Sequence, residues 1–277
     1  MIRKYVAESR RIDSDFVLTG KGGDIGGQLF TLFNSGVTKA IDYKNIVSSQ
    51  RTDTILHLAA KHPNDSVKAL VEANILFLQS VINQDILRFQ NFVNFSSTSV
   101  YGRKCSGVIG EKYAGKELDN YGLTKLLGES IVAESCEYSV SLRCPAILEV
   151  NHSKNLLSKI FNACVSDQTI ELSNGNSLFN TFIDTENLYK FILTLNSNNM
   201  RGQSINVAVK PELTLASIVE TIRDLLGSSS RIILSNKQQP HYLLDIGLVE
   251  QEFDFQPSSA ESIITNWCHK RYETLTH

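Results

Sequence analysis

The sequence has little net charge and few cysteines, and both shortages exclude whole classes of protein. Its 277 residues carry 27 Lys and Arg against 29 Asp and Glu, a formal net charge of -2. Nucleic-acid-binding domains carry a clear basic excess, so we do not expect a general polyanion binder. The five cysteines are odd in number, scattered and never in a CxxC pair, which argues against a disulfide framework or a zinc site. We expect reduced thiols and no metal.

Long apolar runs are also missing. No stretch approaches the roughly 18 apolar residues of a membrane span. The start, MIRKYVAESRRIDSD, lacks the apolar core of a secretory signal. These absences favour a cytoplasmic protein with neither a membrane nor a nucleic acid as partner.

Short β-rich runs alternate with helical patterns from residue 15 onward. The candidate strands are FVLTG, VTKAID, TILHLAA, FVNFSS and YSVSLRC. They lack strict period-2 alternation, which indicates burial on both faces, as in a parallel sheet. Helical spacing of apolar residues covers 26–33, 67–86 and 123–137. The alternation predicts an α/β fold with a Rossmann-type doubly wound parallel sheet.

The alternation of strands and helices changes after about residue 150. Short strands, QTIELSN and NTFID, mix there with helical patterns over 215–226 and 258–269. We expect a polar extension over 1–14, a sheet domain over 15–150, and a smaller α+β substrate-binding region over 151–277.

Five glycines fall between residues 20 and 27, behind the strand FVLT and ahead of the helix GGQLFTLF. Gly20, Gly23 and Gly26 have GxxGxxG spacing. A tight strand-to-helix turn of this kind lets the backbone approach a pyrophosphate, and the helix N-terminus offers unpaired N–H groups. A glycine-rich surface turn is the alternative interpretation. The flanking strand and helix favour a dinucleotide site.

Asp42 ends the second predicted strand, where an acidic residue binds the adenosine ribose in dinucleotide folds. In that role it would favour NAD over NADP. Only 14 residues separate Asp42 from His57, which leaves little room for a complete further crossover. A solvent-facing turn is the alternative for Asp42. We expect His57 to be a packed histidine of the core or of the cofactor edge.

Two further segments, NFSSTSVYG and YGLTK, carry hydroxyl, phenol and ammonium groups. Tyr121 and Lys125 are four residues apart, so on a helix they share a face. A nearby cation favours the phenolate and lowers the tyrosine pKa from about 10. Such a tyrosine can move a hydroxyl proton while hydride passes to or from a nicotinamide. A serine at the preceding strand end can hold the substrate oxygen.

In this order the motifs resemble the extended short-chain dehydrogenase/reductases, in the NAD-dependent epimerase/dehydratase group that acts on nucleotide sugars. VLTGKGGDIGG resembles the family's TGxxGxIG loop, ILHLAA its strand-end HLAA, FSSTSVYG its SSxxVYG and YGLTK its YxxxK. Asn74 stands where the family has a helix asparagine. In the last third, NTFIDTENL and GQSINVAVKPELTLASIVETI are similar to family segments as well.

The resemblance implies a site position by position. It makes Tyr121 the general acid/base, Lys125 its partner and Ser97 the catalytic serine that binds substrate. The implied cofactor is NAD, with NADP as the alternative, bound by Gly20, Gly23, Asp24, Ile25, Gly26, Asp42, Leu58, Ala59, Ala60, Ser96, Tyr121, Lys125 and Pro145. The implied substrate is a nucleotide sugar, bound by Ser97, Thr98, Ser99 and Tyr121. It also implies a homodimer through a four-helix arrangement of the 67–86 and 123–137 helices.

Departures from the family pattern narrow the reaction. Family dehydratases place Asp and Glu where this chain has Thr98 and Ser99, so a 4,6-dehydratase is not expected. The 3,5-epimerase/reductases use a Cys at the position of Ser99 and a His, and Asn151, not a His, directly follows RCPAILEV. AILEVNHS replaces the family's Asn-Val-Tyr-Gly-Pro, and Asn180 replaces an arginine. We therefore predict a nucleotide-sugar 4-epimerase, ahead of a reductase of a 4-keto-6-deoxy nucleotide sugar. The third hypothesis is that the chain is a non-catalytic dinucleotide-binding protein.

Overall fold

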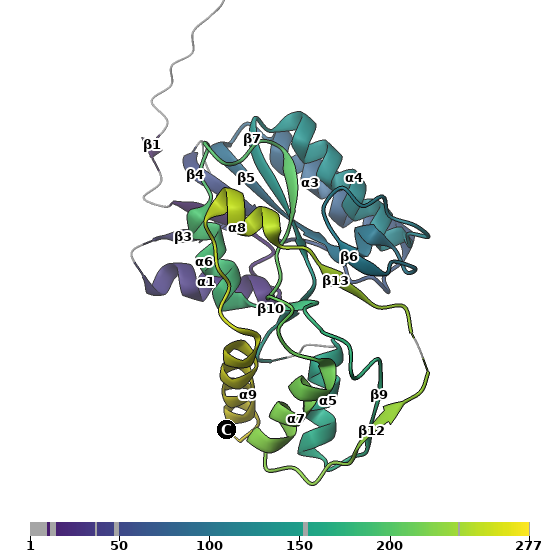
Figure 1. Ribbon diagram of the computed structural model, residues 1–277. Helices are drawn as coiled ribbons and strands as arrows, with labels where there is room; N and C mark the ends of the chain where they lie inside the picture. The colour runs from purple at the N-terminus through teal and green to yellow at the C-terminus, as the bar shows by residue number, and fades with distance from the viewer. Residues whose placement is uncertain are drawn as a thin grey trace, which may run out of the picture.

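A parallel sheet forms the larger of two lobes in the computed structural model, which describes residues 10–11, 15–36, 38–46, 50–151, 155–237 and 239–276 (Figure 1). In spatial order its strands are β11 (Gln203–Asn206), β7 (Tyr138–Cys144), β5 (Leu87–Ser97), β4 (Gln50–His57), β2 (Phe16–Thr19) and β3 (Ala40–Asp42). All neighbours pair in parallel. The doubly wound parallel sheet predicted from the sequence is confirmed.

The predicted extension over 1–14 lies largely outside the described residues. Its described part is β1 (Arg10–Arg11), which pairs with Gln50 and Arg51 at the start of β4.

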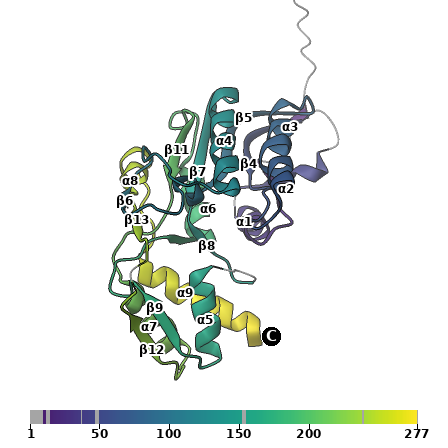
Figure 2. The ribbon, with the colours of Figure 1, turned by 90° about the vertical axis from the view of Figure 1, so that its right-hand side faces the viewer.

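Helices cover both faces of the sheet (Figure 2). One face carries α1 (Asp24–Ser35) packed on α6 (Thr185–Thr194). The other carries α4 (Asn120–Ser135) beside a long helix made of α2 (Val67–Val71), the π-helical turn η2 (Glu72–Leu76) and α3 (Phe77–Asn83). The predicted helix over 67–86 is thus one helix with a π turn in its middle, a feature that often marks functional positions.

Among the residues that the structure describes, the sheet has one strand fewer beside β3 than a complete dinucleotide fold. Counted from β2, the strands lie in the order 2-1-3-4-5-6, whereas the two-halved fold has 3-2-1-4-5-6. A parallel crossover needs a dozen or more residues before its strand begins, and the interval between Asp42 and β4 is too short for it. Among the described residues that interval holds the single turn η1 (Tyr43–Asn45), and β3 becomes the edge strand.

The smaller lobe packs three helices over a two-stranded sheet. Its helices are α5 (Leu156–Val165), α7 (Leu215–Leu225) and α9 (Ala260–Thr276), and its strands are β9 (Ile170–Ser173) and β12 (Ile232–Ser235). Phe161 and Trp267 are buried in its core, with their rings in contact.

Short elements join the two lobes. They are η3 (Thr98–Tyr101), β6 (Gly107–Ile109) paired with β13 (Tyr242–Leu244), β8 (Ala146–Leu148) paired with β10 (Phe182–Asp184), and α8 (Gly247–Phe253). Strand β11 and helices α6 and α8 come from beyond residue 150, yet they complete the large lobe's sheet and core. The chain therefore passes between the lobes more than once.

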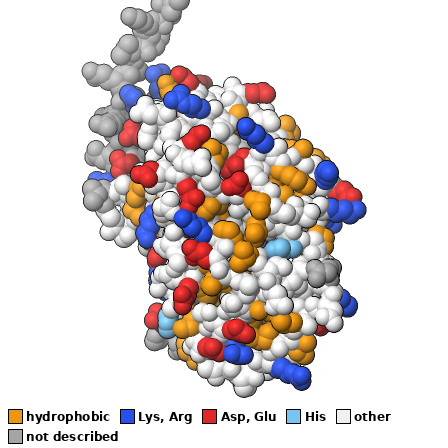
Figure 3. Space-filling view, viewed as in Figure 1, with side chains coloured by type: hydrophobic (Ala, Val, Ile, Leu, Met, Phe, Trp, Pro, Cys, Tyr) orange, Lys and Arg blue, Asp and Glu red, His pale blue; other side chains and the backbone are white. Residues whose placement is uncertain are grey.

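The described surface mixes charges of both signs. On the face in Figure 3, Lys and Arg are interspersed with Asp and Glu, and hydrophobic side chains gather along the middle. All five cysteines are buried and free. Within the described ranges, no helix is long and apolar enough to cross a membrane, and no group of three or more metal-binding side chains is found.

Candidate active site

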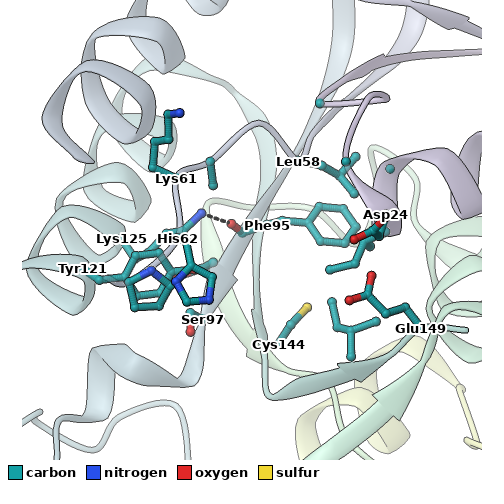
Figure 4. A pocket seen from close by; sticks show the side chains of 18 of the residues that line it. Asp24, Leu58, Lys61, His62, Phe95, Ser97, Tyr121, Lys125, Cys144 and Glu149 are labelled. Atoms are coloured by element: carbon teal, nitrogen blue, oxygen red, sulfur yellow. Dashed lines mark hydrogen bonds between the residues drawn. The ribbon is translucent and has the colours of Figure 1, made fainter. Parts of the chain in front are cut away.

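A cavity of about 420 Å³ opens at the carboxyl ends of β2, β4, β5 and β7 (Figure 4). Crevices at this end of a parallel α/β sheet are where such folds bind ligands. Most of the site residues predicted from the sequence line it. These are Gly20, Gly23, Asp24, Ile25, Gly26, Leu58, Ala60, Ser96, Ser97, Tyr121, Lys125 and Pro145.

The glycine loop forms one wall because it can turn more tightly than other residues allow. A Cβ on Gly26 would lie 2.2 Å from the carbonyl oxygen of Gly20, so only glycine lets α1 start this close to β2. A Cβ on Gly23 would instead meet just one atom, 3.5 Å away. The loop is therefore closed toward the protein at Gly26 and open toward the cavity at Gly23. This is the shape that a pyrophosphate beside a helix N-terminus requires.

His57 belongs to the core beneath the cavity. It is buried, it shares a 3.0 Å hydrogen bond between its Nδ1 and Thr19 Oγ1, and its ring lies against Phe77 and Phe92. Burial, with a contribution from the positive charge of Lys125, lowers its pKa to about 3. The prediction of a packed histidine of the core or of the cofactor edge is confirmed.

Ser97, Tyr121 and Lys125 converge on the opposite wall (Figure 4). The Lys125 Nζ lies 5.8 Å from the centre of the Tyr121 ring and donates a 2.7 Å hydrogen bond to Phe95 O on β5. Tyr121 lies near enough to Ser97 for the serine hydroxyl to lower the pKa of the phenol, against the effect of burial. Helix α4 thus presents its phenol and ammonium to the end of β5.

Capping and close packing hold the start of α4 at this wall. The Asp119 side chain caps the helix by accepting a 2.8 Å hydrogen bond from Gly122 N. A Cβ on Gly122 would lie 2.4 Å from Ser99 O. Glycine after Tyr121 therefore lets the helix rest directly on the turn that follows Ser97.

One electrostatic expectation was wrong. Tyr121 does not have a lowered pKa; burial chiefly, with Cys144 and Asp119, raises it to about 12, and the Ser97 hydroxyl opposes that rise. Burial also lowers the pKa of Lys125 to about 8, against contributions from Cys144 and Glu129. Desolvation outweighs the attraction between the two groups because both are buried.

Asn74, in the π turn, connects two segments at the edge of the cavity through hydrogen bonds. Its Nδ2 donates to Thr124 Oγ1 at 2.9 Å, and its Oδ1 accepts from Lys61 N at 3.3 Å. The turn thereby links α4 to the loop after β4.

Four predicted residues do not line this cavity. Ala59 lies behind the glycine loop, with its N–H donating to Thr19 Oγ1 at 3.2 Å. Asp42 ends the edge strand, and its carboxylate accepts from Lys44 N at 3.1 Å to cap η1. Thr98 and Ser99 line a smaller cavity of about 140 Å³.

That smaller cavity lies beyond the Ser97–Ser99 contact, in which Ser97 Oγ donates to Ser99 Oγ at 3.2 Å. Arg103, Asp119 and Tyr242 contribute to its walls.

Sequence reasoning missed part of the lining. Lys61, His62 and Pro63 continue the loop after β4, and the rule that ligands bind at strand ends could have found them. Phe95 and Cys144 end buried strands, while Ile147 and Glu149 follow β7. In Figure 4, Asp24 and Glu149 lie across the cavity from Tyr121 and Lys125. No motif in the sequence indicates Glu149.

Asn180, the residue in place of the family's arginine, has a structural role. Its Nδ2 donates to Val209 O at 3.1 Å and to Leu244 O at 2.9 Å, and its Oδ1 accepts from Leu244 N at 3.0 Å. Both the nitrogen and the oxygen of the Asn180 side-chain amide are thus bonded to backbone groups inside the protein. Asn180 therefore cannot replace a phosphate-binding arginine.

The geometry agrees with the comparison of the sequence with known families. Residues 5–208 match the sequence model of the NAD dependent epimerase/dehydratase family. Because the match spans most of the chain, the protein belongs to this family. A nicotinamide dinucleotide cofactor, predicted from the glycine loop, is confirmed at the level of the family.

Individual relatives are more distant. The chain is 26% identical over 216 residues to the GDP-6-deoxy-D-talose 4-dehydrogenase of Aggregatibacter actinomycetemcomitans, covering 69% of this chain and 73% of that protein. The UDP-glucuronic acid 4-epimerase of Bacillus cereus, solved with NAD, has a TM-score of 0.75 at 16% identity and covers 94% of this chain and 97% of its own. RMD from Pseudomonas aeruginosa, complexed with NADPH, has a TM-score of 0.75 at 14% identity, covering 94% and 100%.

Proposed function

We propose that this chain transfers a hydride at C4 of a nucleotide sugar, with Tyr121 as the group that moves the hydroxyl proton. The observation that carries the proposal is the convergence of Ser97, Tyr121 and Lys125 on the same cavity as the glycine loop. Neither Thr98 nor Ser99 is a carboxylate or a thiol, so elimination of water and epimerisation beside a ketone have no acid or base there.

The residues that would hold the cofactor fit it. The N-terminus of α1 and the open side of Gly23 suit a pyrophosphate, while Leu58 and Ala60 border the same cavity. When bound, a nicotinamide dinucleotide would supply the hydride acceptor or donor. The Lys125 ammonium, held by Phe95 O, is placed to bind a ribose hydroxyl.

The protonation state of Tyr121 favours one direction. With its pKa raised to about 12 by burial, the phenol is protonated near neutral pH and ready to give its proton to a ketone oxygen. Ser97, which lines the same cavity as Tyr121, can donate to the same oxygen. The resting site is therefore prepared for reduction of a 4-keto sugar.

We place net dehydrogenation or reduction at C4 ahead of epimerisation. The related sequence named a GDP-6-deoxy-D-talose 4-dehydrogenase supports this order.

The 4-epimerase predicted from the sequence is the second candidate. The cavity of about 140 Å³ beyond Ser99 favours it, because an epimerase must let its keto sugar turn over before the hydride returns. Epimerisation uses the same three residues and needs no net cofactor.

One experiment separates these proposals. Freshly purified protein is denatured, and the released small molecules are identified by mass spectrometry. Empty protein that oxidises NADH or NADPH with a 4-keto-6-deoxy nucleotide sugar supports the reductase. Stoichiometric NAD, with interconversion of C4 epimers and no net change in cofactor, supports the epimerase. Protein that binds neither dinucleotide contradicts both, and Tyr121→Phe is the matched control for any activity found.

A homodimer belongs to the same proposal. Apolar side chains on α2 and α4 face solvent, and these helices pack side by side. The most exposed are Val67, Leu123 and Leu127, each with at least half of its surface accessible. Light scattering should give twice the chain mass, and Leu123→Glu with Leu127→Glu should give a monomer. A wild-type monomer would remove this part of the proposal.

A further inference from the structure

Behind the catalytic wall lies a buried polar network centred on Glu129. Tyr121, Lys125 and Glu129 follow one another at four-residue spacing, so they share a face of α4. Glu129 and its partner Arg143 on β7 are both buried. Arg143 Nε lies 3.0 and 3.2 Å from the two carboxylate oxygens, and one terminal nitrogen lies 2.7 Å from Oε2.

Three more polar groups complete the network. Ser96 Oγ donates to Glu129 Oε1, and Ser204 Oγ donates to Oε2 at 2.8 Å. On the other side, Arg143 donates to Tyr101 OH at 3.2 Å. The Glu129 carboxylate thus accepts hydrogen bonds from Arg143, Ser96 and Ser204, and the two from the guanidinium are charge-assisted.

This network is hydrogen-bonded to β5, the strand that ends at Ser97. Lys125 holds Phe95 O, and Glu129 holds the next residue, Ser96. Two successive turns of α4 therefore clamp two successive residues of β5, directly before Ser97. A shift of α4 along β5 would break both bonds.

In the described structure four titratable side chains face Lys125, and Glu129 is the charged one among them. The others are Tyr121 on the same helix, Cys144 on β7 and His57 on β4. Burial raises the pKa of Tyr121 and of Cys144 to about 12 and lowers that of His57 to about 3, so all three are neutral near pH 7. The Glu129 carboxylate raises the pKa of Lys125, against the burial that lowers it.

We propose that Glu129, fixed by Arg143, is a positioning residue that keeps Lys125 charged and sets the distance between Tyr121 and Ser97. This inference rests on the proposed function, because it assigns Lys125 a task toward a bound dinucleotide. Glu129 and Arg143 lie behind the wall of the cavity, and neither of them lines the cavity.

The test is the pH dependence of NADH binding, followed by nucleotide fluorescence between pH 6 and 10. In the wild type, affinity falls as Lys125 loses its proton near pH 8. In Glu129→Gln the midpoint of this fall moves to lower pH by about one unit, the size expected when a close opposite charge is removed. Glu134→Gln, an exposed carboxylate on the same helix, keeps the wild-type midpoint.

Removing one charge of a buried pair can prevent folding, so the double variant Glu129→Gln with Arg143→Gln is measured as well. It removes both charges of the Glu129–Arg143 pair, so neither partner is left charged without the other, and it should show the same acidic shift. Folded variants with the wild-type midpoint overturn the inference and leave the proposed function intact. A wild type that binds no dinucleotide at any pH overturns the proposed function and this inference with it.

Discussion

Two regions of the large lobe are built in different ways, and we name them after the roles proposed for them. At the catalytic end, Ser97, Tyr121 and Lys125 stand on a buried strand and a capped helix, with the Glu129–Arg143 pair behind them. At the adenosine end, which lies outside the cavity lining, Asp42 stands on an edge strand that is three residues long and leads into a single turn. Chemistry tolerates little displacement of reacting groups, whereas recognition can be spread over many weak contacts.

The largest effect should come from the catalytic end. Tyr121→Phe removes the hydroxyl that moves the proton, so we expect turnover to fall by about 10² to 10⁴-fold, the usual contribution of a general acid. The dinucleotide should still bind. Turnover with the identified sugar and cofactor titration measure the two effects separately. Tyr138→Phe, outside the cavity lining, should keep wild-type turnover; a Tyr121→Phe protein with full activity would exclude the proposed role.

The glycine loop should respond next. In Gly26→Ala the new methyl would lie 2.2 Å from Gly20 O, so the loop or the helix must move. We expect the free energy of unfolding to fall by about 1–3 kcal/mol and dinucleotide affinity to fall with it. Gly22→Ala is the matched control, because nothing lies within 4 Å of its new methyl. Equal urea denaturation curves for the two variants would contradict the tight turn.

Stability at alkaline pH tests the burial of Lys125. Its pKa is about 8 in the folded chain and 10.5 ordinarily, so between these values the unfolded chain binds more protons. The free energy of unfolding of the wild type should therefore rise with pH there, relative to Lys125→Met, by up to about 1.4 kcal/mol per pH unit. Urea denaturation at pH 7, 8, 9 and 10 measures this difference. A constant difference across the series would mean that Lys125 is not desolvated as the structure shows.

The smallest effect should come from the adenosine end. Asp42→Ala removes one hydrogen bond to Lys44 N, and we expect a loss of about 0.5–1.5 kcal/mol in stability. Since Asp42 does not line the cavity, NAD affinity should change by less than about fivefold. Calorimetric titration with NAD and NADP checks this. A tenfold loss of affinity confined to NAD would show that Asp42 binds the ribose, and it would contradict the difference between the two ends.

Much of the fold follows from local pattern. The strand YSVSLRC coincides with β7, and the glycine loop lies between β2 and α1 as predicted. The π turn in the 67–86 helix could not be predicted, because apolar spacing looks the same whether or not one turn widens. Within this turn Asn74 bonds Thr124, a residue 50 positions away, and no local pattern shows so distant a partner.

The sequence by itself determined the order of the groups proposed to react and the parallel sheet that brings them together. Motif spacing encodes these directly, since residues four apart share a helix face and parallel strands end at one edge. Only the tertiary structure decided how those groups ionise, that Asn180 is used internally, and that Ala59 and Asp42 stand outside the cavity. It alone joined Glu129 to Arg143 and Ser96. Burial and long-range partners set these properties, and neither can be read from neighbours along the chain.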